Sequence, residues 1–280
     1  MEANAYPAET VEGWYVLHQM FALDRPALRT LGAERLNRAV QAAGETLDAL
    51  AAPAEGGWSA VVPLVGSRAD VMLVHLRPTL DGLGAVQNRL RCLTLFDALE
   101  PRYAFLSVTE VGMYHVAARA ARDARERGGA VGDETFRQQL AERIEKERST
   151  EHVQRRLYPS PPADMPYVSF YPMTKRRAPG QNWYTQPVEE RSRMMVAHGM
   201  TGRRYAGRIV QIVTGSIGLD AWEWGVTLFA RDPLDFKKIV TEMRFDEASA
   251  NYAEFGDFYV GRRVAPGEWL ATLRGFASGG

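Results

Sequence analysis

Aromatic and basic residues are concentrated in one segment of the chain, residues 170–184. Within it, Tyr171 is followed four residues later by Lys175, and then by Arg176 and Arg177. A phenol near an ammonium and two guanidinium groups suits a ligand that carries carboxylates, because these cations form charge-assisted hydrogen bonds with carboxylate oxygens. A solvent-exposed basic loop has the same composition, so composition alone leaves both interpretations open.

Histidine supplies the second candidate chemistry. His198 follows Met194 and Met195 by four and three residues, so on a helix it lies on the side that these methionines occupy. If that side faces a sheet, the imidazole projects into an apolar interior, where it serves as a ligand or as a structural or helix-capping residue. His18 and His75 lie within predicted strands, and we interpret them as structural. A site with several histidines would need distant segments, whereas a cofactor with one axial imidazole would not.

The composition excludes several classes of protein. The 280 residues include 34 Lys plus Arg, 34 Asp plus Glu and one cysteine, Cys92. Balanced charge argues against a nucleic-acid-binding domain, which usually carries a basic excess. A single cysteine excludes an internal disulfide and a zinc site built from cysteines, and it fits a reducing compartment.

Targeting signals and common catalytic motifs have no positive match. The first ten residues lack a basic cluster followed by an apolar run, so we expect a cytoplasmic protein. No window approaches the ~18 apolar residues of a membrane span, so we expect no transmembrane helix. The Gly215–Gly218 segment lacks the lysine and the spacing of a phosphate loop. Neither the Gly-x-Ser-x-Gly nor the His-Glu-x-x-His pattern occurs, so serine-hydrolase and zinc-peptidase chemistry are not indicated.

Hydrophobic periodicity predicts the elements that must position these residues, and the same order of six elements occurs twice. The first half has the order β-α-β-β-α-β, with a strand over 14–21, a helix over 26–52 that weakens near Gly44, a hairpin of strands 58–65 and 69–76, a helix over 79–99 and a strand over 103–116. The second half repeats it, with a strand over 167–171, a helix over 188–199, strands over 208–214 and 222–230, a helix over 233–253 and a strand over 255–262.

This duplication predicts an α+β fold in which two tandem ferredoxin-like halves form an α+β barrel. We expect an N-terminal half over 1–116, a charged helical connector over 117–156 and a C-terminal half over 157–280. The connector is rich in Ala, Arg and Glu, and we interpret it as helices with a solvated face rather than as a dedicated binding arm.

Several longer motifs are specific enough to indicate a family. They are Phe-Tyr-Pro-Met-Thr-Lys-Arg-Arg at 170–177, Asn-Trp-Tyr at 182–184, His-Gly at 198–199, Arg-Tyr-Ala-Gly at 204–207, Thr-Gly-Ser-Ile-Gly-Leu-Asp-Ala-Trp-Glu-Trp-Gly at 214–225 and Met-Arg-Phe-Asp-Glu-Ala-Ser-Ala-Asn-Tyr at 243–252. Through them the chain resembles the chlorite-dismutase-like haem proteins, and within that family the branch that decarboxylates coproheme. Trp-Tyr-Val-Leu-His at 14–18 and Leu-Ser-Val-Thr-Glu at 106–110 extend the resemblance into the first half.

The resemblance implies a fold, a reaction and partners. The family fold is two ferredoxin-like halves in an α+β barrel, usually assembled as a ring of five subunits. The implied reaction converts iron coproporphyrin III (coproheme) to haem b by hydrogen-peroxide-dependent oxidative decarboxylation of two propionates, through a three-propionate intermediate, as the last step of coproporphyrin-dependent haem biosynthesis. The C-terminal half would carry the porphyrin site, and a transient contact with coproporphyrin ferrochelatase is also implied.

The resemblance also implies roles for individual residues. His198 matches the proximal ligand of the haem iron. Tyr171 matches a redox-active tyrosine, which loses an electron and a proton and then takes a hydrogen atom from the propionate β-carbon. Lys175 matches the lysine that binds the reactive propionate and assists proton transfer, and Arg156 matches a propionate-binding arginine. The spacing from Arg156 to Tyr171 is one residue longer than the family pattern, so Arg155 remains an alternative.

Four further positions are implied to line the pocket. Tyr114 and Ser249 match residues that hydrogen-bond propionates, Met173 lines the same pocket, and Gln211 matches the position above the iron. Chlorite dismutases place an arginine there, whose fixed charge holds an anionic oxidant. Because a neutral amide supplies no such charge, Gln211 favours decarboxylation over chlorite chemistry. A non-catalytic haem-binding or regulatory protein and an unrelated small-molecule scaffold are the remaining alternatives.

Overall fold

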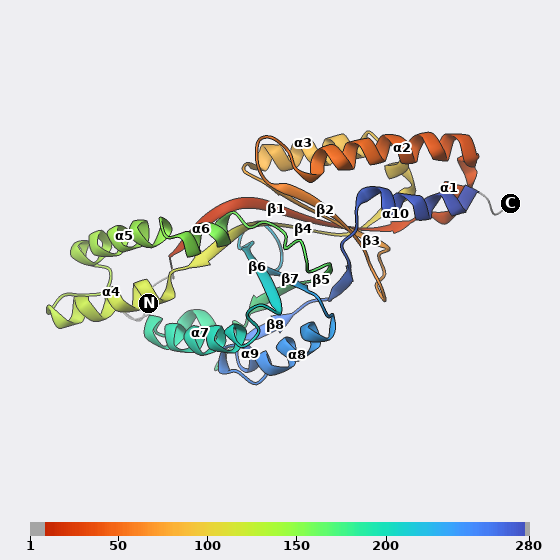
Figure 1. The fold of residues 1–280 in the computed structure, drawn as a ribbon. Helices are drawn as coiled ribbons and strands as arrows, with labels where there is room; N and C mark the ends of the chain where they lie inside the picture. Colours follow the sequence, from red (N-terminus) through yellow and green to blue (C-terminus); the bar gives the residue numbers. More distant parts are fainter. Residues whose placement is uncertain (1–8, 278–280) are drawn as a thin grey trace.

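The structure, a computed structural model, describes residues 9–277 as a curved antiparallel sheet covered by helices (Figure 1). The first half contains β1 Thr10–Leu23, α1 Arg25–Thr30, α2 Gly32–Ala51, β2 Trp58–Pro63, β3 Val71–Arg77, α3 Leu80–Arg91 and β4 Leu99–Gly112. The connecting helices are α4 Tyr114–Glu126, α5 Glu134–Arg148 and α6 Glu151–Leu157. The second half contains β5 Tyr167–Lys175, α7 Val188–Arg203, β6 Ile209–Gly215, β7 Trp224–Ala230, α8 Leu234–Met243, α9 Glu247–Ala250, β8 Ala253–Phe255, β9 Tyr259–Arg262 and α10 Pro266–Leu273.

The two halves have the same sheet order. In the first half the strands run β2-β3-β1-β4, and in the second half they run β6-β7-β5, with β8 and β9 both paired to the free edge of β5. In each half the first strand therefore lies between the third and the last, which is the ferredoxin-like arrangement. The predicted fold of two such halves is confirmed.

Two seams join the halves. At one, β4 pairs with β6 through Val108↔Gly215 and Thr109↔Thr214. At the other, isolated bridges Val61↔Val264 and Leu64↔Gly261 bring the β9 segment back to β2. Because the two outer ends of the sheet meet at this second seam, the sheet curls into a barrel. Its interior is filled by buried apolar side chains from both halves: Val16, Met20, Trp58, Val62, Met72, Phe105, Phe170, Ile212 and Phe229.

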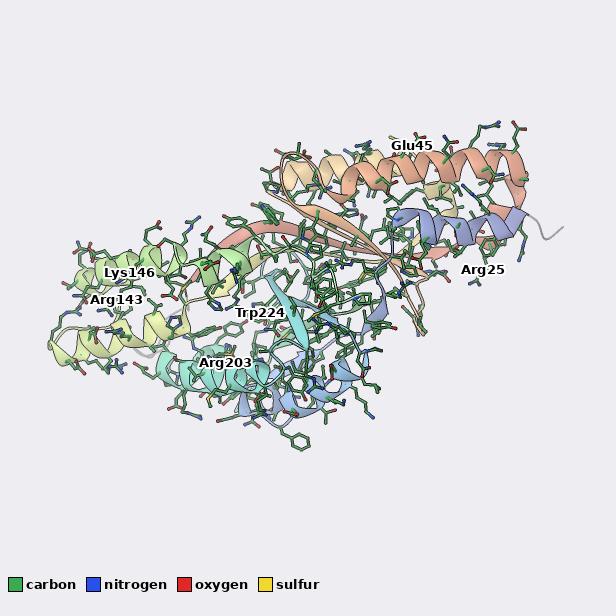
Figure 2. The ribbon with its side chains drawn as sticks, in the orientation of Figure 1. Arg25, Glu45, Arg143, Lys146, Arg203 and Trp224 are labelled. Carbon is green, nitrogen blue, oxygen red and sulfur yellow. The ribbon has the colours of Figure 1, made fainter. Side chains whose placement is uncertain are left out.

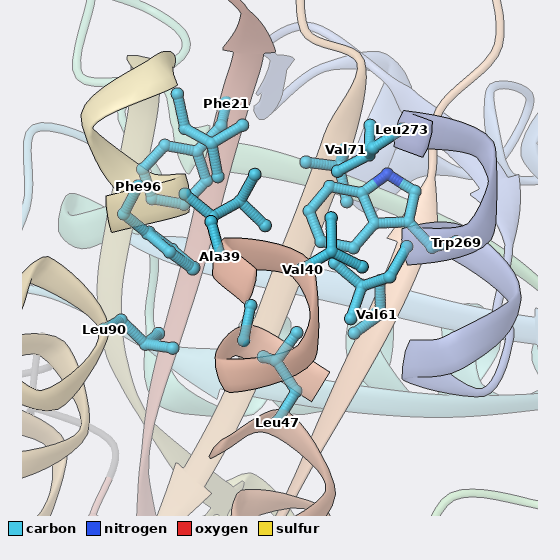
Figure 3. Close-up of a cluster of buried hydrophobic side chains, with 14 of the residues drawn as sticks. Phe21, Ala39, Val40, Leu47, Val61, Val71, Leu90, Phe96, Trp269 and Leu273 are labelled. Atoms are coloured by element: carbon cyan, nitrogen blue, oxygen red, sulfur yellow. The ribbon is translucent and has the colours of Figure 1, made fainter. Parts of the chain in front are cut away.

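Helices of the first half cover the outer side of the sheet with a second apolar core. Figure 3 shows Val40 and Leu47 of α2 near the strand residue Val61 and near Trp269 and Leu273 of α10. Helix α10, which periodicity did not predict, thus packs against the first half although it follows the last strand.

The prediction that the first helix weakens near Gly44 is wrong. The break lies at Leu31, where α1 ends and Gly32 adopts φ +70°, whereas Gly44 lies within α2. A Cβ atom at Gly44 would be 3.4 Å from Leu270 of α10, so this glycine permits close helix packing rather than a bend.

Other element boundaries also differ from the prediction. The strand predicted over 103–116 runs from Leu99 to Gly112, so Tyr114 begins helix α4 instead of ending a strand. The helix predicted over 233–253 is divided into α8 and α9, because Asp246 starts a new helix as its N-cap. The last strand is likewise divided into β8 and β9.

The connector contains helices α4, α5 and α6, and it turns at Gly128, which has φ +77°. Its helices bury an apolar stripe of Ala117, Ala120, Ala121, Ala124, Phe136 and Leu140. Charged residues such as Arg143 and Lys146 lie on α5, well away from Trp224 of the sheet (Figure 2). Among residues 9–277, no helix combines the length and the apolar character needed to cross a membrane.

Candidate functional site

Three of the predicted site residues share one face of β5. Alternate residues of a strand point to opposite faces. Phe170 belongs to the barrel interior, whereas Tyr171 and Met173 belong to an apolar cluster with residues of β7 and α8. Tyr171, Met173 and Lys175 therefore point outward, to the side on which α7, α8 and α9 lie (Figure 1).

Tyr171 is enclosed by aromatic rings. Its side chain is 5% exposed, its ring stacks on Phe258 with 4.5 Å between centroids, and Phe255 lies 5.9 Å away. Burial raises the pKa of the Tyr171 phenol, and the nearby Arg244 opposes this only in part. The phenol is therefore neutral at ordinary pH and keeps a hydrogen that it can give up.

Lys175 is buried next to an aromatic ring and a carbonyl. Its Nζ donates a hydrogen bond of 2.9 Å to the carbonyl of Ala248 in α9 and lies 4.3 Å from the centroid of the Trp183 ring. Burial lowers the pKa of Lys175 to about 8, although Asp246 and Glu223 act to raise it. An ammonium with this pKa can bind an anion and also release its proton near neutral pH.

His198 lies on α7, and its ring is held from one side. Nδ1 lies 2.9 Å from Oδ2 of Asp246, and the same carboxylate caps α9 by accepting the N–H of Ser249 at 2.9 Å. Burial raises the pKa of Asp246, but the hydrogen bonds from His198 and Ser249 outweigh burial, so the pKa is lowered and the group stays ionised. An ionised acceptor favours the tautomer with the proton on Nδ1, which leaves the lone pair of Nε2 free for a metal.

The short helix α9 connects the lysine with the histidine. The backbone carbonyl of Ala248 in α9 accepts the hydrogen bond from the Lys175 ammonium. The carboxylate of Asp246, the N-cap residue of α9, contacts Nδ1 of His198. The hydroxyl of Ser249, a predicted propionate ligand, lies 3.3 Å from the same Asp246 oxygen that contacts His198. Three predicted site residues, Lys175, His198 and Ser249, are thus brought together by one segment.

Gln211 lies on β6, on the same side of the sheet as Tyr171. Its neighbour Ile212 points into the barrel, and its cross-strand partner Leu228 belongs to the outer cluster around Tyr171. One strand, β7, separates the two residues, so their backbones are roughly 10 Å apart, given ~4.8 Å between neighbouring strands. The Gln211 side chain is exposed, so the helices leave this position of the outer face uncovered.

Arg156 is connected to this face through Glu110 and Trp224. Trp224, which pairs with Met173, donates a 2.7 Å hydrogen bond from Nε1 to Oε1 of Glu110. The two side chains meet over Gly215, where a Cβ atom would be 2.0 Å from Oε2 of Glu110. Burial raises the pKa of Glu110, the Trp224 hydrogen bond and Arg156 oppose this, and Glu110 in turn favours the charged form of Arg156.

Arg155, the alternative to Arg156, has a different environment. It forms an ion pair with Glu151 on the outer surface of α6, and its side chain is 77% exposed. The side chain of Arg156 is exposed as well, but the charge of Glu110 acts on Arg156, whereas no described contact links Arg155 to the outer face of β5.

Tyr114 reaches the site from the connector. Its ring lies 6.3 Å from the ring of Trp183, which also contacts Lys175 and Tyr252. Burial raises the pKa of Tyr114, which keeps the phenol neutral and able to donate.

Several residues of the site were not predicted. Asp246, Glu110, Trp183 and Trp224 act through contacts with residues that are distant in sequence. The Asp-Glu-Ala-Ser sequence at 246–249 carries an N-cap signal, but it does not indicate which histidine the aspartate contacts. No local pattern in the sequence indicates the other long-range contacts.

These residues fit an iron porphyrin with carboxylate side chains. The free Nε2 of His198 suits an axial iron ligand, Lys175 and Arg156 suit carboxylates, and the exposed Gln211 on the facing sheet offers a neutral amide. A group of three or more His, Cys, Asp or Glu side chains that could hold a bare metal ion does not occur among residues 9–277.

Comparisons with known proteins identify a matching family model and similar sequences. The family model described as chlorite dismutase matches residues 37–264. The chain is 42% identical over 268 residues to a protein from Staphylococcus carnosus (strain TM300) named coproheme decarboxylase, and the match covers 95% of this chain and 97% of that protein.

Solved structures of similar proteins have the same fold. A structure described as a novel haem-binding protein from Thermus thermophilus has a TM-score of 0.82 and 36% identity, and covers 98% of this chain and 99% of that one. A chlorite dismutase variant from Candidatus Nitrospira defluvii has a TM-score of 0.70 at 16% identity, covers 94% of this chain and 96% of that one, and supports the fold alone.

Proposed function

The chain belongs to the chlorite dismutase family, and we propose that it catalyses the hydrogen-peroxide-dependent oxidative decarboxylation of iron coproporphyrin III to haem b. One observation carries the proposal: His198, held at Nδ1 by Asp246, is linked through α9 to Lys175, and Lys175 lies on the strand face that carries Tyr171. This arrangement supplies an iron ligand, a proton-transfer group and an oxidisable phenol together.

The reaction balances without a further oxidant. Each propionate, as R–CH2–CH2–COO⁻, reacts with one H2O2 and one proton to give a vinyl group, CO2 and two waters. The substrate's own iron, activated by peroxide, accepts the two electrons. The protein must hold the porphyrin, present one propionate at a time and move protons.

His198 binds the substrate iron through Nε2. The Asp246 carboxylate fixes the ring orientation and increases the basicity of the imidazole by accepting from Nδ1. The opposite face of the porphyrin lies toward the sheet, where Gln211 faces the peroxide. A neutral amide there can donate to and accept from peroxide, but it does not hold an anion as a guanidinium does, so we do not propose chlorite chemistry.

Tyr171 carries the radical step. Its phenol gives up one electron and the hydroxyl proton, and the resulting tyrosyl radical takes a hydrogen atom from the β-carbon of a propionate. Loss of a second electron from that carbon releases CO2 and forms the vinyl group. The aromatic enclosure by Phe255 and Phe258 keeps water away from the radical.

Lys175 and Arg156 bind propionates as cations. Lys175 also exchanges a proton at Nζ, which its lowered pKa allows. Tyr114 and Ser249 donate hydrogen bonds to propionates, and Met173 fills the space between Tyr171 and Lys175 on the strand. These roles rest on the positions of the residues and on the family resemblance.

Finer features follow from the same proposal. The first decarboxylation gives a three-propionate intermediate, which stays bound for the second. We further propose that the protein works in the cytoplasm as a homopentamer and receives its substrate through transient contact with coproporphyrin ferrochelatase. The division into 1–116, 117–156 and 157–280 is proposed as well.

Turnover tests the proposed function. The purified chain is incubated with iron coproporphyrin III and hydrogen peroxide, and porphyrin masses are followed. We expect the three-propionate species and then haem b. Binding without any loss of CO2 would instead support a non-catalytic haem-binding protein, and absence of a Soret change on mixing would contradict porphyrin binding altogether.

A further inference from the structure

Glu223 is a buried carboxylate outside the set of eight candidate porphyrin-site residues. It directly precedes β7 and is 7% exposed. Burial of a carboxylate is costly unless hydrogen bonds and cations compensate it. The neighbours of Glu223 therefore indicate what its charge does.

Three hydrogen bonds fix Glu223 at the point where β5 ends. Its Oε2 accepts the backbone N–H of Lys175 at 2.7 Å. Its own backbone N–H donates to the carbonyl of Met173 at 3.1 Å, and its carbonyl accepts from the N–H of Ser216 at 2.8 Å. The pairing of β5 with β7 ends at Met173↔Trp224, so the Glu223 carboxylate replaces a strand carbonyl as the acceptor for Lys175.

Two cations are affected by the Glu223 charge. Nη1 of Arg177 lies 3.9 Å from Oε1, but the Arg177 side chain is 68% exposed, and ion pairs of exposed side chains contribute little. The second cation is the buried ammonium of Lys175, on which Glu223 acts through its charge. The hydrogen bond to the Lys175 backbone thus keeps this carboxylate near the lysine whose charge it favours.

Asp246 also acts on the Lys175 ammonium, but it has other functions. Burial lowers the pKa of Lys175 to about 8, and both Asp246 and Glu223 oppose this effect. Asp246 contacts Nδ1 of His198 and caps α9 at the N–H of Ser249. Among the hydrogen bonds and ion pairs of residues 9–277, none joins Glu223 to His198 or Asp246. A change at Glu223 therefore alters the charge near Lys175 and leaves the contact of the iron ligand in place.

Other carboxylates on the elements around Lys175 have cation partners of their own. Glu254 of β8 lies 3.5 Å from Nε of Arg176, and Glu247 of α9 lies 2.8 Å from Nη2 of Arg193. These pairs do not contribute to the lowered pKa of Lys175. Glu254 is therefore a suitable control for Glu223.

The same charge acts on two neighbouring phenols. Burial raises the pKa of Tyr114 and of Tyr184, and Glu223 acts in the same direction on both. Arg191 of α7 acts in the opposite direction on Tyr114. Glu223 therefore favours the protonated form of Lys175 and of both phenols, which keeps hydrogen-bond donors on this side of the site.

We propose that Glu223 is a positioning residue for the decarboxylation: its carboxylate holds the end of β5 at Lys175 and keeps the Lys175 side chain an ammonium, ready to bind a propionate. The inference rests on the proposed function, which gives Lys175 this task. A negative charge near the site also repels propionates. Removal of the charge should therefore leave coproheme affinity undiminished at low pH and weaken it once Lys175 loses its proton.

Titration of Lys175 by NMR tests the charge effect without porphyrin. The chain has four lysines, Lys146, Lys175, Lys237 and Lys238, so full-length protein made with lysine carrying ¹³C at Cε gives few resonances. Lys175→Met identifies the resonance of Lys175. Between about pH 6 and about pH 11 we expect a wild-type midpoint near 8 and, in Glu223→Gln, a midpoint lower by roughly one pH unit. Glu254→Gln is the matched control and should leave the midpoint unchanged.

Hydrogen exchange tests the hold on the strand. The side-chain carbonyl of glutamine still accepts an N–H, whereas leucine has no acceptor. We expect the Lys175 amide to exchange at the wild-type rate in Glu223→Gln and at least 10-fold faster in Glu223→Leu. Both variants remove the charge, so if thermal unfolding shows that one does not fold, the other decides the lysine titration.

The loaded protein gives a third readout. With iron coproporphyrin III bound, the alkaline fall in decarboxylation rate should move to lower pH in Glu223→Gln by the same interval as the Lys175 midpoint. An unchanged Lys175 midpoint in Glu223→Gln, an equal shift in Glu254→Gln, or an alkaline fall that stays at the wild-type pH would each overturn the inference. Wild-type protein that binds coproheme without decarboxylating it would contradict the proposed function instead, and the lysine titration would still decide the effect of Glu223.

Discussion

Nδ1 of His198 lies 2.9 Å from Oδ2 of Asp246, and this contact joins helix α7 to the N-cap of α9. The carboxylate serves two groups at once, because it also accepts the backbone N–H of Ser249. Orientation of the imidazole and formation of α9 are therefore coupled, and α9 in turn receives Lys175.

Asp246→Asn tests this coupling while keeping a residue that can cap a helix. Removal of the charge makes His198 a weaker iron ligand, so we expect coproheme affinity to fall roughly 10-fold to 100-fold, as for other residues that orient metal ligands. Absorption titration measures the affinity, and the iron spin state reports the ligand strength. Glu247→Gln, which removes a neighbouring exposed carboxylate that pairs with Arg193, should change neither.

The lowered pKa of Lys175 predicts how turnover depends on pH. The ammonium that binds the propionate loses its proton as pH rises through about 8, so we expect the rate of decarboxylation to fall above that pH. Lys175→Met should be slow at all pH values and should lack this alkaline limb. If the limb were identical in wild type and Lys175→Met, the assignment of the titrating group to Lys175 would be wrong.

The close approach of Glu110 to Gly215 predicts that a larger residue at position 215 disturbs the Glu110–Trp224 contact. A Cβ atom at this position would be 2.0 Å from Oε2 of Glu110, so Gly215→Ala must displace Glu110, whose charge favours the charged form of Arg156. We expect a loss of about 1–3 kcal/mol in unfolding free energy and weaker coproheme binding. Gly84→Ala is the matched control: nothing lies within 4 Å of the new methyl group, and alanine favours helix α3 by up to about 1 kcal/mol. Chemical denaturation compares the two.

Arg156 and Arg155 provide a pair of neighbouring variants. Because Arg156 is coupled to Glu110 whereas Arg155 pairs with Glu151 on the outer surface, Arg156→Gln should weaken coproheme binding and Arg155→Gln should not. A loss of one charge-assisted hydrogen bond corresponds to about 1.5–3 kcal/mol, or roughly 10-fold to 100-fold in affinity. The reverse pattern would assign the propionate to Arg155.

Local patterns in the sequence were sufficient for much of the fold. Alternation and helical spacing predicted both β-α-β-β-α-β halves. The strand predicted over 167–171 was too short, however: β5 continues to Lys175, and only this extension places Tyr171, Met173 and Lys175 on one strand face. Glycine was harder to interpret: Gly32, at positive φ, begins α2 directly after the break at Leu31, while Gly44 lies inside α2, where α10 packs against it. Helix boundaries such as the start of α4 at Tyr114 depended on tertiary contacts.

The contacts that complete the site could not be predicted in this way. Asp246 and His198 are 48 residues apart, and Glu110 and Trp224 are 114 apart. No periodicity indicates such pairs, because they depend on how two halves close on each other. The roles of the eight site residues and the three-part division of the chain stay predictions.

The release of CO2 per peroxide, compared between wild type and Tyr171→Phe, tests the central claim most directly. Both proteins are loaded with iron coproporphyrin III and given measured amounts of hydrogen peroxide, and CO2 and porphyrin masses are recorded. We predict two CO2 for two peroxides and formation of haem b in the wild type, and normal coproheme binding with stalled decarboxylation in Tyr171→Phe. Wild-type protein that binds coproheme and releases no CO2, or Tyr171→Phe that turns over normally, would contradict the account.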